Sequence, residues 1–136
     1  MPEPTEEGWG PLREELAADV RRVADRLRSL SQARLAAPVP PHATRADAAR
    51  QAAAVLATAA QGVEERARPT EPAWRTLPAL ADFAVGDQVA VTGQDLVAAA
   101  ARVAADAPVW APGGRRRAGD VVAEAAEVLS AVRRLL

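Results

Sequence analysis

Polar residues follow the edge of an apolar pattern in the segment "AVGDQVAVTGQDLVAAA", residues 84–100. On a helix, Gln88, Thr92 and Asp95 share one face because they are separated by four and three positions. A buried amide, hydroxyl or carboxylate needs hydrogen-bond partners, and each unpaired group costs about 1–3 kcal/mol. Gln51, on an earlier helical pattern, is a candidate partner. We call these four residues the polar seam.

The polar seam has two interpretations. It forms a closed hydrogen-bond network that fixes the register of neighbouring helices, since buried polar groups in native proteins are nearly always paired. Alternatively, it lines a small polar pocket that binds a ligand. Arg22 and Arg26, on the first helical pattern, are further candidate partners.

The segment "GGRRR", residues 113–117, is a candidate anion site. Arg115, Arg116 and Arg117 concentrate positive charge, and the glycines free the backbone for close contact. However, no aromatic residues are interleaved with them, which favours a solvated loop. The formal net charge of -1 provides no general attraction for a polyanion, so nucleic acid is not expected as a partner.

The residue types do not support a familiar catalytic or metal centre. The chain has no cysteine, and its single histidine, His42, has no carboxylate at a recognisable ligand spacing. A Ser-His-Asp set cannot be assembled with confidence. Glu124 and Glu127 are three positions apart and could share a helix face, but their arginine-rich surroundings favour surface ion pairs. We therefore expect no metal and no cofactor.

Composition indicates one small cytoplasmic domain. Of the 136 residues 49% are hydrophobic but only 3% are aromatic, so alanine must supply much of the core. All basic residues are arginine, which suggests a GC-rich genome, and the absence of cysteine fits a reducing compartment. The apolar run at 96–105 is interrupted by Arg102 and is shorter than the roughly 20 residues that span a bilayer. We expect a flexible segment at 1–10 and one domain at 11–136.

Hydrophobic periodicity predicts helices in the first half of the chain. Leucine and valine recur at steps of three and four between Leu12 and Leu30, which predicts a helix over 11–30. The segment "SQARLAA" continues it or forms a short extra turn. Thr44 then has the features of a cap for a second helix, with Asp47 three positions later. Prolines in "RPTEPAWR" end that helix.

A third helical region is predicted after Thr76, as one bent helix or two short ones because it contains Gly86 and Gly93. We expect a close packing contact at Gly93. A loop follows, and Asp120 is predicted to cap a final helix that extends to about residue 135. With four amphipathic helices and no strand, the expected fold is all-α, an antiparallel four-helix bundle. The three tryptophans are expected to close its ends.

The order of these patterns resembles a known family. The similar part is a long helix followed by "LRSLSQARLAAPVPPHATRADAARQAAAVL" and "LPALADFAVGDQVAVTGQDL". In this part the chain is similar to the DinB-type four-helix bundles, especially the actinobacterial, mycothiol-dependent maleylpyruvate isomerase branch. The resemblance covers most of positions 12–100. It implies an up-down bundle and a metal-dependent thiol transfer that uses histidine ligands.

The ligand positions implied by that resemblance carry other residues. Thr92 stands where a histidine is implied in "VTGQDL", Gln51 stands near a second such position, and Gln88 lies one turn before Thr92. Amide and hydroxyl oxygens bind transition metals more weakly than imidazole.

We therefore expect a metal-free, non-catalytic protein that binds a protein partner, a second copy or a small ligand. Alternatives are a degenerate thiol-dependent transferase that acts without metal, with Asp95 or a nearby carboxylate as base, and an anion or nucleic-acid binder that uses the three adjacent arginines.

Overall fold

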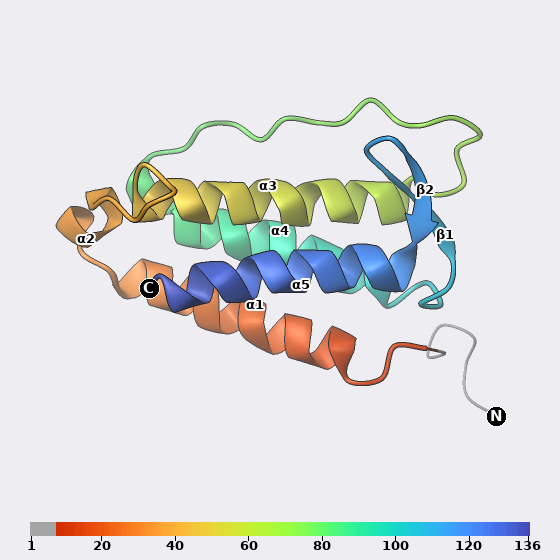
Figure 1. Cartoon of the computed structure of the whole chain (residues 1–136), viewed down its shortest axis with the longest axis horizontal. Helices are drawn as coiled ribbons and strands as arrows, with labels where there is room; N and C mark the ends of the chain where they lie inside the picture. The colour runs from red at the N-terminus through yellow and green to blue at the C-terminus, as the bar shows by residue number, and fades with distance from the viewer. Residues whose placement is uncertain (1–7) are drawn as a thin grey trace.

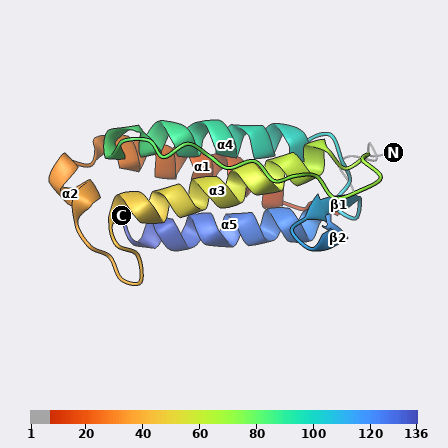
Figure 2. The same cartoon turned by 90° about the horizontal axis from the view of Figure 1, so that it is seen from above.

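The structure is a computed structural model in which residues 8–136 are described. Most of the predicted flexible segment, residues 1–7, lies outside the described residues. Four long helices lie side by side, with a short helix at one end and a small antiparallel sheet at the other (Figures 1 and 2). The elements in chain order are α1 (Leu12–Ser29), α2 (Gln32–Ala36), α3 (Arg45–Glu64), the 3-10 turn η2 (Asp82–Ala84), α4 (Val85–Ala100), β1 (Pro108–Ala111), β2 (Gly114–Arg117) and α5 (Ala118–Arg134).

The helices predicted in the first half of the chain are confirmed. Helix α1 begins after Pro11, and the segment that follows it forms the short turn α2. Helix α3 begins after Thr44, whose Oγ1 accepts a hydrogen bond from the backbone N–H of Asp47 at 3.0 Å. This side chain satisfies one of the backbone donors that a helix start leaves unpaired, which explains why the helix begins at Arg45.

The long helices do not simply alternate in direction, as the predicted antiparallel arrangement requires. Helices α3 and α4 run in the same direction, and α1 and α5 run in the opposite direction (Figure 1). The chain makes this possible with a long connection, residues 65–81, that returns along the whole length of α3 (Figures 1 and 2). We call this connection the crossover strap.

The crossover strap replaces the first part of the predicted third helix. Thr76 caps nothing, because residues 74–81 contain no helix and α4 begins only at Val85. Pro78 explains much of the difference: proline lacks a backbone donor and disfavours helical geometry in the residue before it. The apolar residues between Leu77 and Ala84 have helical spacing, but residues 77–81 form no helix. Helix α4 itself is continuous through both of its glycines.

A β-hairpin stands where the prediction had only a loop. Strands β1 and β2 pair antiparallel, with Trp110 opposite Arg115. They are joined through Pro112 and Gly113, and Gly113 has a φ of 96°, which glycine adopts without strain. The expectation of no strands is therefore wrong, although the all-α class holds in outline. Four-residue strands are too short to show a clear alternation in sequence.

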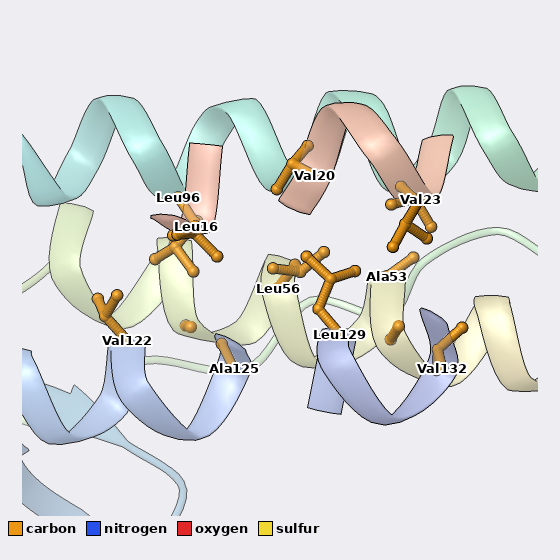
Figure 3. Packing of buried hydrophobic residues seen from close by; sticks show 14 of the residues in the cluster. Leu16, Val20, Val23, Ala53, Leu56, Leu96, Val122, Ala125, Leu129 and Val132 are labelled. Atoms are coloured by element: carbon orange, nitrogen blue, oxygen red, sulfur yellow. The ribbon is translucent and has the colours of Figure 1, made fainter. Parts of the chain in front are cut away.

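The core lies between the four long helices and is rich in alanine and valine. Leucines from four different helices, Leu16, Leu56, Leu96 and Leu129, are fully buried and belong to one hydrophobic cluster (Figure 3). Small residues let the helices approach closely. A Cβ placed on Gly93 would lie 2.5 Å from a methyl carbon of Val20, which confirms the predicted close contact.

Trp9 belongs to the folded domain. Its ring is buried, and its Nε1 donates a hydrogen bond to the carbonyl oxygen of Val103 at 2.8 Å. The guanidinium of Arg13 lies 5.2 Å from the ring centre. The packed structure therefore includes Trp9, two residues before the predicted domain boundary at 11.

Candidate functional site

The structure places two members of the polar seam in the interior. Gln88 and Thr92 are 8% and 5% exposed. Thr92 Oγ1 donates a hydrogen bond to the carbonyl oxygen of Gln88, one turn earlier in the same helix, at 2.8 Å. Gln88 Nε2 donates to the carbonyl oxygen of Pro78 in the crossover strap at 3.1 Å. Each of the two side chains therefore donates a hydrogen bond to a backbone carbonyl oxygen.

The other two members, Gln51 and Asp95, are exposed. Within residues 8–136, no side-chain to side-chain hydrogen bond joins any two of the four. The arginines considered as partners lie elsewhere: Arg22 bonds Asp19, and Arg26 donates to the terminal residue Leu136. The structure thus brings together only Gln88 and Thr92.

Gln88 is one of three long polar side chains on α3 and α4 that bond to the backbone of the crossover strap. Gln61 donates from Nε2 to the carbonyl oxygen of Ala73 at 2.9 Å and accepts at Oε1 from the backbone N–H of Arg75 at 3.0 Å. Arg50 donates to the carbonyl oxygen of Leu80 at 2.8 Å. A segment without secondary structure has unpaired backbone groups, and these side chains pair some of them.

Gln61→Ala is expected to lower the free energy of unfolding by about 1 kcal/mol, because two backbone groups of the strap lose their partner. The effect stays small since Ala73 and Arg75 are at the surface, where water replaces part of the lost bonding. Urea unfolding measures the change, and the Arg75 amide should exchange faster with deuterium. Gln51→Ala, on the exposed side of the same helix, is the matched control. Equal stabilities for the two variants would contradict the role of Gln61.

Arg115 of the predicted anion site is engaged inside the molecule. Its guanidinium donates to the carbonyl oxygens of Arg66 and Arg68, at 2.6 and 2.9 Å, and lies 3.8 Å from the centre of the Trp110 ring. The Nε1 of Trp110 also donates to the carbonyl oxygen of Arg68 at 3.1 Å. The hairpin therefore fastens the beginning of the crossover strap.

The other two arginines of that site differ from each other. Arg116 forms a hydrogen-bonded ion pair with Glu124 of α5. This bond, reinforced by the negative charges of Glu124 and Asp120, raises the pKa of the Arg116 guanidinium above its usual value. The Arg117 side chain is exposed and has no hydrogen bond or ion pair with the described part of the chain. The three arginines do not form one cluster aimed at a single anion.

An open apolar groove lies between α3, the hairpin and the first turns of α5. Its volume is about 430 Å³. Helix α3 contributes small side chains, the hairpin contributes aromatic and proline surface, and the Arg116–Glu124 ion pair is also part of the lining. The residues on which the following sections depend are Ala54, Thr58, Trp110, Pro112, Arg116 and Glu124.

The hairpin forms one wall of the groove because α3 has a glycine where the two meet. A Cβ on Gly62 would lie 1.9 Å from the main-chain carbonyl oxygen of Trp110. Only glycine permits this approach, so Gly62 positions Trp110 and Pro112 beside Ala54.

No single motif in the sequence could have revealed the groove. It is formed by α3 and, much later in the chain, by the hairpin and the start of α5, and the sequence predicts a loop where the hairpin stands. The available signals were the Pro-Gly-Gly sequence after Trp110, typical of a turn, and a glycine near the end of an otherwise alanine-rich helix.

His42 is half-buried and lies in a turn. Its backbone N–H donates a hydrogen bond to the carbonyl oxygen of Val39 at 2.9 Å. Residues 8–136 contain no group of three or more histidine, aspartate or glutamate side chains arranged to hold a metal ion. In the same part of the chain, no helix combines the length and the apolar character needed to cross a membrane.

Comparisons with known proteins found no relative. No protein-family model matches the chain, and neither a curated protein nor a solved structure gives a significant match. The groove geometry is therefore the basis for the functional proposal.

Proposed function

We infer that this protein is a non-catalytic binding protein and that the groove beside Trp110 is its ligand site. The observation that carries this proposal is the groove itself, whose volume of about 430 Å³ falls in the range of small-molecule sites, about 300–1,000 Å³. Its walls are mainly alanine, valine, proline and tryptophan, and its charged lining residues are Arg116 and Glu124. This combination suits a small molecule with an apolar body.

The residues around the groove favour binding over catalysis. Thr58 provides the only side-chain hydroxyl in the lining, and no histidine or second carboxylate is present there to activate it. The carboxylate of Glu124 is paired with Arg116. A general base needs a free carboxylate or imidazole within hydrogen-bond reach of a reacting group.

We further propose that the four long helices form a metal-free four-helix bundle, distantly related to the DinB type and located in the cytoplasm. Support comes from the single apolar core between the four long helices, and from Thr92, which occupies a position where the resemblance implies a histidine. Its hydroxyl is bonded to the carbonyl oxygen of Gln88, so the position serves the helix. The lack of cysteine fits a reducing compartment.

The groove is tested with 3-methylindole, a neutral apolar probe, followed by two-dimensional NMR of the labelled protein. We expect chemical-shift changes at Ala54, Trp110 and Ala125, which line the groove. Ala54→Leu should weaken binding by about tenfold or more, because the added side chain occupies space that the ligand needs. Leucine is a good helix former, so the helix is retained.

Ala98→Leu is the matched control. Ala98 is exposed on α4 and lies outside the groove, so the same change in side-chain size should leave binding unaltered. If 3-methylindole causes no saturable shifts, or if both leucine variants bind it as the unmodified protein does, the proposed site is wrong.

A further inference from the structure

The groove adjoins a second depression on the surface, and we call the place where the two meet the charged end of the groove. Arg116 and Glu124 line both, and the second depression is also lined by Asp120 and Glu127. Asp120, Glu124 and Glu127 are separated by four and three positions, so they lie on one face of α5. One guanidinium and three carboxylates therefore line the second depression, and two of these groups, those of Arg116 and Glu124, also line the groove.

The neighbouring cations do not neutralise this excess of negative charge. Arg116 is paired with Glu124, and the guanidinium of Arg115 is bonded to carbonyl oxygens of the crossover strap. Within the described residues, Asp120 and Glu127 form no ion pair. Arg117, next to the start of α5, is exposed and is not among the residues that line either depression.

We propose that the groove binds an amphiphilic amine, with its apolar body beside Ala54 and Trp110 and its ammonium group between Glu124 of the groove and Glu127 of the adjoining depression. This inference rests on the proposed function and names its ligand class. A carboxylate has lone pairs for more than one donor, so Glu124 can accept from the ligand while it remains near Arg116. Exposed ion pairs are worth little, so a shift of Arg116 costs little.

An anionic ligand fits this end poorly. Its charge would find one favourable partner, Arg116, whose guanidinium already donates to Glu124, and three carboxylates of like sign. A neutral ligand would gain only the apolar contacts. Among ligands of the same shape, the groove therefore binds the cation most tightly and the anion least tightly.

Three probes that share an indole body test this ranking: tryptamine, 3-methylindole and indole-3-propionate, which are cationic, neutral and anionic at neutral pH. Titration calorimetry at low salt measures each dissociation constant. We expect tryptamine to bind about fivefold more tightly than indole-3-propionate, the effect of one exposed ion pair. Added salt should reduce the difference, because it screens exposed charges.

Two variants assign the preference to the groove. Glu124→Gln removes a carboxylate and frees Arg116, so the preference for tryptamine should disappear or reverse. Glu14→Gln, which removes the same charge from the exposed surface of α1, should leave the ranking unchanged. Ala54→Leu should weaken the binding of all three probes, because they share the apolar site.

The outcomes separate this inference from the function on which it rests. Binding of 3-methylindole in the groove without preference for the cation, or with preference for the anion, overturns the amine as ligand and leaves the groove as the binding site. Tryptamine binding that Ala54→Leu does not weaken also overturns the inference. If none of the three probes binds, the proposed function fails as well.

Discussion

Gly62→Ala is expected to destabilise the protein by about 2–3 kcal/mol, more than alanine at any other glycine of its helices. The alanine Cβ would lie 1.9 Å from the carbonyl oxygen of Trp110, far inside van der Waals contact. The obstructing atom belongs to the main chain, so no rotamer change can relieve the clash. Either the hairpin moves away or the last turn of α3 unwinds. Helix propensity alone would favour alanine by about 1 kcal/mol, so the sign of the measured change distinguishes the two effects.

Urea unfolding of Gly62→Ala gives the stability change, and titration with 3-methylindole gives the effect on the groove. We expect the variant to be less stable and to bind 3-methylindole more weakly, because the displaced hairpin carries Trp110 and Pro112 with it. Gly119→Ala is the matched control: its Cβ would be 3.1 Å from the main-chain carbonyl oxygen of Ala105, which requires a shift of a few tenths of an ångström, far less than at Gly62. A Gly62→Ala variant as stable as the unmodified protein would show that the hairpin does not pack against α3 as described.

The elements that the sequence predicts well are those with local causes. Helix α1 follows from leucine and valine at helical steps, and the start of α3 follows from the Thr44 side chain, which caps it within three residues. The close contact at Gly93 could also be predicted, because glycine inside an apolar helical pattern usually has a packing reason. Each of these features depends either on residues a few positions apart in the sequence or on a residue type with a strong structural preference.

The features that could not be predicted depend on distant segments. Gln88 was correctly placed beside an apolar pattern, but its partner is a carbonyl oxygen of the crossover strap, and no side-chain pattern reports a backbone acceptor. Leu77 and Leu80 imitate a helix because their spacing matches one, while Pro78 between them prevents it. The groove requires α3, the hairpin and α5 together, so its chemistry becomes visible only once their packing is known.

The strap also explains why long polar side chains lie against the core. Two helices that run in the same direction need a connection as long as the helices themselves, and such a connection has no ladder of its own to pair its backbone. Gln61, Gln88 and Arg50 supply that pairing from α3 and α4. Their amide and guanidinium groups are therefore a consequence of the chain topology, and they need no ligand to account for them.

Gly93→Ala is expected to lower the free energy of unfolding by about 2 kcal/mol through the overpacking of α4 against α1. The new Cβ would lie 2.5 and 2.6 Å from the two methyl carbons of Val20, a buried and β-branched side chain with little rotamer freedom. Unlike the clash at Gly62, this one is with a side chain, so a second substitution can remove it. Val20→Ala alone opens a cavity and should also destabilise the protein.

A double-mutant cycle on Val20 and Gly93 follows from this geometry. In the Val20→Ala background, the methyl group of Gly93→Ala enters space that Val20 has left, so the double variant should be more stable than the sum of the single changes predicts. We expect a favourable coupling of at least about 1 kcal/mol, within the range for residues in direct contact. Urea unfolding of the four proteins measures it. Additive changes would mean that α1 and α4 do not meet at these two residues, and the packing that makes an alanine-rich core sufficient would have to lie elsewhere.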